Sequence, residues 1–297
     1  MEKLAIGIDL GATEIKGALV DETGKFIDQR NEPTPATKGR ESVIDKICLV
    51  IDNLIPKNKE ILGIGIGTPG IVDPKTGNII GASPNIIDWP GTPLGSILKN
   101  HYKLPVEVDN DVNTTTLGEL HFGNVTSVRD LACIVIGTGV GIGIVLNGEI
   151  FRKAHELGHM IVKFDGPMCK CGRQGCVEAF ISGTGISNNY YRLTEETISA
   201  KMIFNKSQDN DPNAMKVVDD FVNAFGSAMA NIVLSFFITD FIITGGVARS
   251  LDVFQDRLLS EAGKRSISPL SDQIKIKQGN KHSGILGASS LIFRKRH

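Results

Sequence analysis

The sequence has little of what marks several classes of protein. Only 6% of its 297 residues are aromatic, with a single tryptophan, and 32 basic residues balance 33 acidic ones to a formal net charge of -1. This balance gives no electrostatic reason to expect nucleic acid or an anionic membrane as a partner. The hydrophobic fraction of 41% is typical of a globular protein. At this length the chain fits two domains, each long enough to bury a core.

Long apolar runs are also missing. Asp9 interrupts the first hydrophobic stretch, so the pattern of a secretory signal peptide is not met. Asp240 splits the most apolar later stretch, residues 230–244, which is too short to span a bilayer. We therefore expect a cytoplasmic protein. Cysteines in that compartment argue against a disulfide framework, and we expect the isolated Cys48 and Cys133 to pack in the core.

One pattern occurs twice along the chain. Residues 4–20 read as a strand, a glycine turn and a second strand that leads into a hairpin, and residues 131–151 repeat this order. We interpret the repeat as an internal duplication, with two domains built on one plan and their first turns facing a shared cleft. Asp9 stands before the first turn, whereas Ile136 occupies the comparable place in the second. Only one domain therefore carries a carboxylate there.

The spacing of apolar residues predicts the other main elements. We expect buried strands at 61–69 and 241–246, and helices at 40–54, 182–206, 214–237 and 284–293.

Three glycine turns follow buried strands, at residues 9–13, 137–141 and 244–246. Glycine lets backbone amides approach an anion closely, and threonine adds a hydroxyl donor, so such turns can cradle a polyphosphate. Each turn alone is an ordinary tight turn, but the three together with the duplication favour a nucleotide site. The chain lacks the GxxxxGK[ST] of a P-loop, and residues 137–143 fit the dinucleotide fingerprint poorly because no long helix follows.

Two charged residues lie near the first turn. Asp9 suits a magnesium contact through water, since hard oxygen ligands and phosphate oxygens together hold that ion. Lys16 could add positive charge at the phosphates, but a lone lysine is equally consistent with a surface residue.

Residues 107–113, EVDNDVN, follow a short strand and precede a helix that we expect to begin near Thr114. A carboxylate at a strand end, beside an amide that both donates and accepts, can grip a hydroxyl and remove its proton. The same residue types are good N-cap residues, so helix capping explains the pattern equally well. Residues 83–85, SPN, form another polar loop that is open to both interpretations.

The stretch from Ala154 to Glu178 carries two incompatible metal patterns. Residues 155–159 spell HELGH, the HExxH pattern that zinc metalloproteases place on a helix with the glutamate as base. Cys169, Cys171 and Cys176 follow, and with one histidine they would form a closed Cys3His zinc site. A closed site has no room for a catalytic water, so the two patterns predict different proteins.

The residues around the motif favour the closed site. An HExxH helix must continue past its second histidine, yet residues 160–164 read as a strand, and Gly158 weakens the helix further. Gly172 and Gly175 lie between the thiols, where a tight knuckle around a metal needs them. We therefore predict a structural zinc site in which His159 joins the three cysteines.

Two carboxylates flank this knuckle, Glu156 and Glu178. A rigid zinc site would fix them relative to each other, which is how acceptors for sugar hydroxyls are positioned. His155 is then an ordinary loop or surface histidine.

Taken together, the motifs resemble the ROK family of sugar kinases and repressors, in the superfamily of hexokinase, actin and the heat-shock chaperone ATPases. The match runs through DLGATEIKGA, IGTPGIVD, DNDVN, IGTGVGIGIVLNGEI, ELGH with CKCGRQGCVEAF, and ITGGV. The resemblance implies an α/β fold of two ribonuclease-H-like (actin-like ATPase) domains flanking a deep cleft, with the zinc knuckle in the second. We expect residues 1–118 to form the smaller domain, with a C-terminal helix at about 284–297 packed back on it, and residues 119–283 to form the larger.

The resemblance also implies roles for single residues, with Asp111 as the catalytic base. The sugar would be held by Gly70, Asn85, Asn110, Asp111, Glu156, His159 and Glu178. MgATP would be held by Asp9, Gly11, Ala12, Thr13, Lys16, Gly137, Thr138, Gly139, Gly245 and Gly246. Structural zinc would be bound by His159, Cys169, Cys171 and Cys176. Ala12 is a departure, because relatives often carry a second glycine there, but it is small enough to keep activity.

These roles predict ATP-dependent phosphorylation of a hexose, with the 6-hydroxyl of glucose as first choice because that is the family's commonest activity. Fructose, mannose, allose, N-acetylmannosamine or a β-glucoside are alternatives. Sugar and ATP would be the partners, without nucleic acid or membrane, in a homodimer or homotetramer. A sugar-responsive repressor is not expected, because the family's repressors carry a helix-turn-helix domain before the first glycine turn, and only eight residues precede Asp9.

Overall fold

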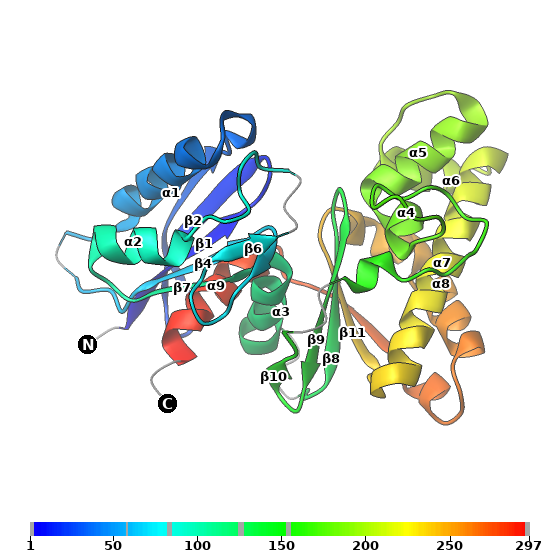
Figure 1. Cartoon of the computed structure of the whole chain (residues 1–297). Coiled ribbons are helices and arrows are strands. Elements are labelled where there is room, and N and C mark those ends of the chain that lie inside the picture. The colour runs from blue at the N-terminus through cyan, green and yellow to red at the C-terminus, as the bar shows by residue number, and fades with distance from the viewer. Residues whose placement is uncertain (1–2, 58, 82–84, 124–127, 153–155, 295–297) are drawn as a thin grey trace. The chain divides into compact units, whose positions relative to one another are not determined.

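The computed structural model describes residues 3–57, 59–81, 85–123, 128–152 and 156–294. The chain divides into two compact units, Met1–Ser127 with Asn280–His297 and Val128–Gly279 (Figure 1). Each unit contains a mixed five-stranded sheet with helices, as expected for an α/β protein. The expected boundary at residue 118 falls inside helix α3 (Asp111–Phe122), which belongs entirely to the first unit.

The sheet of the first unit has the strand order β3-β2-β1-β4-β7. β1 pairs antiparallel with β2 and parallel with β4, and β4 pairs parallel with β7. The strands are β1 (Leu4–Leu10), β2 (Glu14–Asp21), β3 (Phe26–Pro33), β4 (Ile64–Thr68) and β7 (Val106–Asn110). A small second sheet joins β5 (Ile71–Val72) to β6 (Ile79–Gly81). The helices are η1 (Ala36–Lys38), α1 (Arg40–Leu54), α2 (Leu94–Tyr102), α3 and α9 (Ser283–Arg294).

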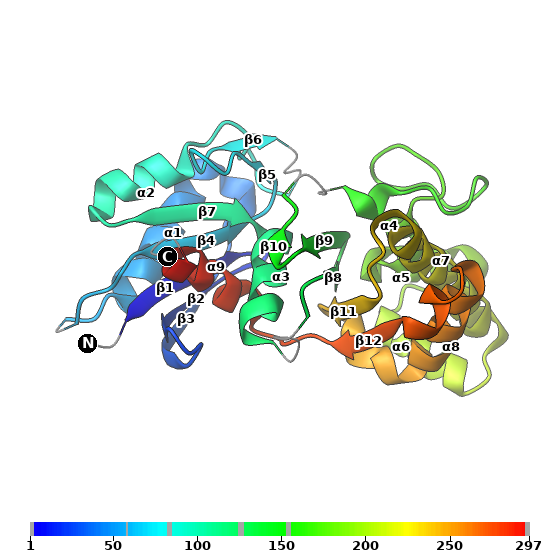
Figure 2. The ribbon, with the colours of Figure 1, turned by 90° about the horizontal axis from the view of Figure 1, so that it is seen from below.

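Helix α9 brings the end of the chain back onto the first unit. It packs against α3 and against β1 and β4, and Figures 1 and 2 both show it beside α3. Small residues allow this approach: a Cβ atom on Gly287 would overlap the carbonyl oxygen of Thr114 in α3. Two segments far apart in the sequence therefore form one tightly packed layer against β1 and β4.

The second unit repeats the plan of the first. Its sheet has the order β10-β9-β8-β11-β12, again a hairpin followed by parallel strands. The strands are β8 (Leu131–Ile136), β9 (Val140–Leu146), β10 (Glu149–Ile150), β11 (Asp240–Thr244) and β12 (Lys275–Gln278). This shared topology supports the duplication inferred from the sequence.

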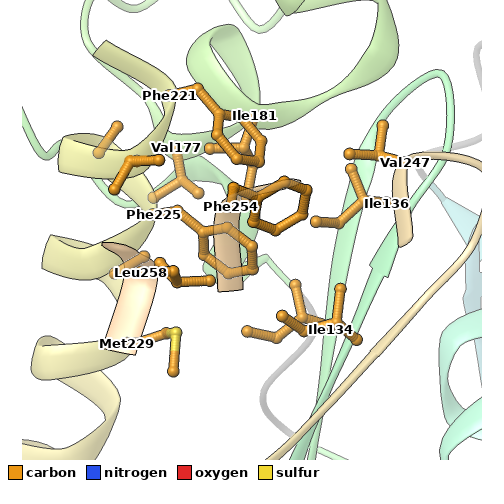
Figure 3. Packing of buried hydrophobic residues seen from close by; sticks show 14 of the residues in the cluster. Ile134, Ile136, Val177, Ile181, Phe221, Phe225, Met229, Val247, Phe254 and Leu258 are labelled. Atoms are coloured by element: carbon orange, nitrogen blue, oxygen red, sulfur yellow. The ribbon is translucent and has the colours of Figure 1, made fainter. Parts of the chain in front are cut away.

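The helices of the second unit cover its sheet. They are η2 (Leu157–His159), α4 (Val177–Ile181), α5 (Gly183–Thr194), α6 (Ala200–Gln208), α7 (Pro212–Phe236), η3 (Val247–Ser250), α8 (Leu251–Arg265) and η4 (Leu270–Gln273). Figure 3 shows the core, in which Phe221 and Phe225 of α7 pack with Phe254 of α8 and with Ile134 and Ile136 of β8. By length and composition α7 could cross a membrane, but 67% of its most apolar window is buried in this core.

Several expected elements differ in detail from the observed ones. The helix expected at 182–206 is two helices, because Glu195 ends α5 in a left-handed conformation and Ser199 caps α6. The strand expected at 160–164 is reduced to a single bridge between Ile161 and Cys176. Helix α3 begins at Asp111 rather than near Thr114. Helices α2 and α8 and strand β12 were not expected.

Candidate functional site

The parallel strands of the first unit bring several expected site residues to one edge of its sheet. Asp9 of β1 is in register with Gly67 of β4, and Gly67 is in register with Asp109 of β7. The carboxyl ends of parallel strands meet at the same edge, where functional side chains of α/β proteins commonly gather. The Asn110–Asp111 pair follows directly at the β7–α3 junction.

Asn110 has a clear structural role at this junction. Its side-chain oxygen accepts hydrogen bonds from the backbone N–H groups of Val112 (2.9 Å) and Asn113 (3.3 Å), and so caps α3. Its Nδ2 donates to the carbonyl oxygen of Gly70 at 3.0 Å. The capping explanation weighed for the sequence is therefore correct, and the Nδ2 bond also ties the loop of Gly70 to Asn110.

Asp109 was not singled out from the sequence, yet it supports the same turn. It is 4% exposed, and its Oδ1 accepts bonds of 2.8 Å from the backbone N–H of Asn110 and from Nδ2 of Asn113. A buried carboxylate with good donors rigidifies its surroundings. Alternation along β7 could not have found Asp109, because this residue falls on the face opposite Val106 and Val108 and is nevertheless buried.

The carboxyl group of Asp111 has an unusual protonation equilibrium. Burial, followed by the charge of Asp9, raises the pKa of Asp111 from 3.8 to about 7, against a bond from the backbone N–H of Val112 that favours the ionised form. A general base works best when its pKa lies near the operating pH. This carboxyl is therefore suited to accept a proton near neutrality.

The pKa of Asp9 is also raised. Burial raises it most, Lys16 lowers it, and Glu14 raises it again. Asp9 and Lys16 face each other across the β1–β2 pair, while the Lys16 ammonium lies 3.8 Å from a carboxylate oxygen of Glu14. A buried carboxylate that is costly to ionise is stabilised by a bound cation, so Asp9 suits a hard divalent ion such as magnesium.

The β1–β2 turn that follows Asp9 is closed by backbone bonds. The N–H of Gly11 donates to the carbonyl oxygen of Glu14 at 2.9 Å, and Thr34 bonds to the carbonyl oxygens of Gly11 and Thr13. Ala12 lies between them, partly exposed.

Asn85 lies in an exposed stretch after the small sheet, and the neighbouring Ser83 and Pro84 are outside the described residues. The loop is anchored by Trp89, which is fully buried and whose Nε1 donates to Oγ1 of Thr68 at 2.9 Å. Thr68 ends β4, so this bond ties the loop of Asn85 to the sheet edge.

The second unit gathers the other glycine turns around one pocket. A pocket of about 620 Å³ is lined by Gly137 and Thr138 of the β8–β9 turn and by Gly246 of the turn after β11. Gly245 has a φ of +94°, which favours glycine, and a Cβ there would overlap the carbonyl oxygen of Ile136. Gly139 closes the first turn by accepting a bond from the N–H of Gly137 at 3.0 Å.

The rest of this pocket was not found from the sequence. Helices α5 and α6 and the turn after β11 supply hydroxyl, cationic and apolar groups, namely Gly183, Thr184, Ser187, Ser199, Ala200, Lys201, Phe204, Val247, Arg249 and Ser250. Neither a motif nor a periodicity marks them, because the pocket is assembled from segments far apart in the chain.

Glu178 connects the glycine turn to the cysteine cluster. Its Oε2 accepts a bond of 2.9 Å from the backbone N–H of Val140, and Oε1 lies 3.7 Å from the sulfur of Cys169. A Cβ on Gly139 would lie 2.7 Å from Oε2, so this turn and the carboxylate approach each other closely.

The four expected zinc ligands come together. One ligand atom from each of His159, Cys169, Cys171 and Cys176 lies within 4.8 Å of the other three, a set that could hold a metal ion. The pKa of the Cys176 thiol is raised to about 12, and burial is the largest cause. A cation bound at the site would have the opposite effect, because it would stabilise the thiolate. The donor set and its compactness fit tetrahedral zinc.

The imidazole of His159 has two neighbours. Its Nδ1 lies 3.6 Å from the sulfur of Cys169, and its Nε2 lies 3.6 Å from a carboxylate oxygen of Glu156. The contacts with the cysteine sulfur and with the carboxylate thus use different ring nitrogens, a pattern also seen in histidines that bind metals. His155 lies outside the described residues, and from Glu156 onward the motif forms only the short helix η2, not the α-helix of a metalloprotease.

The expected site residues therefore form two groups. Asp9, Gly11, Ala12, Thr13, Lys16, Gly70, Asn85, Asn110 and Asp111 belong to the first unit, and Gly137, Thr138, Gly139, Glu156, His159, Glu178, Gly245, Gly246 and the three cysteines belong to the second.

Comparison with known proteins finds relatives that match the chain over most of its length. The glucokinase of Thermotoga maritima is 32% identical over 307 aligned residues, which cover 97% of this chain and 96% of that enzyme. The xylose repressor of Bacillus subtilis is 28% identical, with 97% of this chain and 77% of the repressor covered. The structure of a ROK family glucokinase from Streptomyces griseus in complex with glucose and AMPPNP matches with a TM-score of 0.82 and 29% identity, over 97% of this chain and 98% of that one.

A model of the ROK family matches residues 5–295, almost the whole of the described structure. This extent and the glucokinase identity confirm the resemblance inferred from the motifs: the chain belongs to the ROK family.

Proposed function

We propose that the protein is an ATP-dependent sugar kinase in which Asp111 is the catalytic base. The observation that carries the proposal is the placement of Asp111 at the β7–α3 junction with a pKa raised to about 7. A sugar hydroxyl is a weak nucleophile, and a carboxylate that accepts its proton as the new bond forms lowers the barrier.

The reaction transfers the γ-phosphoryl group of ATP. The hydroxyl oxygen of the sugar forms a bond to the γ-phosphorus, the bond from that phosphorus to the bridging oxygen of ADP breaks, and the hydroxyl proton passes to Asp111. Asn110 and Asp109 keep the base in place through their bonds at the start of α3. Magnesium, when bound near Asp9, would neutralise charge on the phosphates.

ATP is assigned to the pocket of the second unit. Its volume of about 620 Å³ is within the usual range for small-molecule sites, and its lining combines apolar groups with hydroxyls and two cations. The backbone amides of the turns at Gly137 and Gly245 would take phosphate oxygens, as nests of N–H groups do. Thr138 and the β1–β2 turn with Thr13 would add hydroxyl donors.

Glucose is our first choice of sugar, with phosphorylation at the 6-hydroxyl. Support comes from the relatives named glucokinase, at about 30% identity, and from the related structure in complex with glucose and AMPPNP. Gly70, Asn85, Asn110, Glu156, His159 and Glu178 are assigned to the sugar hydroxyls.

Zinc is assigned a structural role. The Cys3His set leaves no open position for a catalytic water, and η2 ends at His159. The metal would hold His159 and, through it, Glu156. It would also fix the loop between Met160 and Cys176 to the start of α4.

ADP release in the presence of a panel of hexoses and amino sugars, followed by product analysis, tests the proposal. We expect sugar-dependent turnover that is highest with glucose, and Asp111→Asn should lower kcat by roughly 100- to 10,000-fold, the usual contribution of a general base. Substantial sugar-dependent turnover by this variant would contradict the role of Asp111. Sugar binding without ADP release in the wild type would instead favour a sugar sensor of the repressor type.

A further inference from the structure

A second buried carboxylate on α3 has no place in the proposed chemistry. Glu119 is 2% exposed, and its Oε1 accepts a hydrogen bond of 2.6 Å from the backbone N–H of Asn280 and a short one from the hydroxyl of Ser283. Burial raises the pKa of this carboxyl, while the bonds from Ser283 and Asn280 lower it. Buried ionisable groups are costly, so a carboxylate oxygen that accepts from two donors holds those donors firmly.

The segment held by Glu119 begins helix α9. Asn280 is the first residue of the chain after it returns to the first unit, and Ser283 is the first residue of α9. Gly118, next to Glu119, has no side chain, and a Cβ there would overlap the carbonyl oxygen of Ser283. α3 therefore grips the first turn of α9 by close backbone packing and by the Glu119 side chain.

The same turn contacts Asp9. Gly284 follows Ser283, and a Cβ on Gly284 would lie 2.7 Å from Cγ and from Oδ2 of Asp9. The backbone of the first turn of α9 thus forms part of the wall around the Asp9 carboxylate. Glu119, Ser283, Gly284 and Asp9 make a continuous series of contacts, all within the first unit.

We propose that Glu119 is a positioning residue that clamps Asn280 and Ser283, and that the first turn of α9 held in this way fixes the carboxylate of Asp9. The proposal rests on the proposed function, in which Asp9 lies beside the phosphates of ATP. It assigns a role in nucleotide use to a residue that touches neither substrate.

Side-chain substitutions can separate the positioning role of Glu119 from a general contribution to folding stability. Glu119→Gln keeps a side-chain oxygen acceptor of similar shape, whereas Glu119→Leu removes the acceptor of the Asn280 N–H and leaves the Ser283 hydroxyl with only the carbonyl oxygen of Asn280. Gly284→Ala leaves the clamp intact but places a methyl group against Asp9. The matched control is Gly263→Ala in α8, where the nearest atom to a new Cβ lies 3.8 Å away.

Hydrogen exchange of the amides at the start of α9 reports on the clamp without catalysis. We expect much faster exchange there in Glu119→Leu and near wild-type exchange in Glu119→Gln. Unchanged exchange in Glu119→Leu would overturn the clamp, because the turn would then be held by backbone packing alone.

Steady-state kinetics report on the consequence. Glu119→Leu and Gly284→Ala should each lower kcat/KM for MgATP by roughly 10- to 100-fold, the scale of a misplacement of about 1 Å, with KM for the sugar within about twofold. Glu119→Gln and Gly263→Ala should stay close to wild type. The link to Asp9 would be overturned if kcat/KM fell equally for the sugar and for MgATP. It would also be overturned if Gly284→Ala had the kcat/KM of the wild type for MgATP. A wild type without sugar-dependent ADP release would refute the proposed function but not the exchange result.

Discussion

The charge of Asp9 raises the pKa of the Asp111 carboxyl at the sheet edge of the first unit. After burial, the charge of Asp9 is the largest cause that raises the pKa of Asp111, and both groups are hard to ionise together. Burial and the charge of Asp9 together raise the pKa of the proposed base to about 7.

The first prediction concerns the pH profile. Asp111 accepts a proton only when ionised, so kcat/KM should rise with pH through an apparent pKa near 7. Asp9→Asn removes the negative charge that raises this pKa. The rising limb of the pH profile of kcat/KM should then move to lower pH, even if turnover is weaker. Asp28→Asn, an exposed carboxylate paired with Arg30, is the control and should leave the limb in place. A limb that does not move in Asp9→Asn would show that the two groups are not coupled.

The second prediction concerns the N-cap of α3. Asn110→Ala removes the acceptor for two backbone N–H groups and should lower the free energy of unfolding by about 1 kcal/mol, as measured by urea denaturation. Asn110→Asp keeps that acceptor but loses the donor to the carbonyl oxygen of Gly70, so we expect it to retain the cap and to lose only that second bond. Its new charge should raise the pKa of Asp111 and move the kinetic limb to higher pH.

Asp211→Ala provides a control for this pair, because Asp211 caps α7 in the second unit. We expect a similar loss of stability with an unchanged pH limb. If Asp211→Ala also shifted the rising limb of the pH profile, the shift seen in the Asn110 variant could not be attributed to the place of Asn110 beside Asp111.

The third prediction concerns the metal. Cys169→Ser and Cys171→Ser should each strongly reduce zinc in the purified protein, measured by emission spectroscopy, and lower the thermal midpoint, because metal binding stabilises the folded knuckle. Cys48→Ser, outside the cluster, should retain the metal. Glu156→Ala should also retain it while weakening sugar binding. Peptide cleavage that disappears in Glu156→Ala, with zinc kept in the cysteine variants, would support the metalloprotease pattern instead.

The fourth prediction concerns stability at mildly acid pH. Burial, followed by the charge of Arg294, lowers the pKa of His121 from 6.5 to about 4. Between these values the unfolded chain binds a proton that the folded chain does not, so stability falls as pH decreases from about 6.5 towards 4. At about 1.4 kcal/mol per pKa unit the upper limit of the loss is roughly 3 kcal/mol, and solvent screening of this partly buried group makes the loss smaller.

Urea denaturation of the wild type and of His121→Gln at pH 7.5 and at pH 5 measures this loss. The variant should lose less stability than the wild type between the two values. His101→Gln, at an exposed position on α2, is the matched control and should follow the wild type. Equal losses in His121→Gln and the wild type would mean that His121 titrates normally.

Local sequence patterns were reliable where one segment carries the whole signal. The alternation and glycine spacing of residues 4–20 predicted the β1–β2–β3 meander, and the repeat at 131–151 predicted the same plan in the second unit. Helices α1 and α7 followed from apolar residues at helical spacing, because one face of each is buried. The Cys-x-Cys-x4-Cys spacing and His159 predicted a cluster that the structure brings together.

The start of α3 and the strand after His159 were predicted less well. Asn110 is a cap whose acceptor reaches Val112 and Asn113, so the helix starts three residues earlier than its apolar spacing indicated. The stretch after His159 has strand-forming residues, but it forms only the bridge from Ile161 to Cys176, with loop structure on either side. Tertiary context overrides propensity in short segments of this kind.

The sequence by itself thus determined the fold class, the duplication, the family and the cluster of His159 with three cysteines, because each depends on residues that are close in the chain or on a recurring pattern. Only the tertiary structure decided the protonation of Asp111, the lining of the pocket by α5 and α6, and the contact of Glu119 with the start of α9. Glu119 and Asn280 are 161 residues apart. The burial and the electrostatic effects that arise when such distant segments meet cannot be predicted from a local sequence pattern.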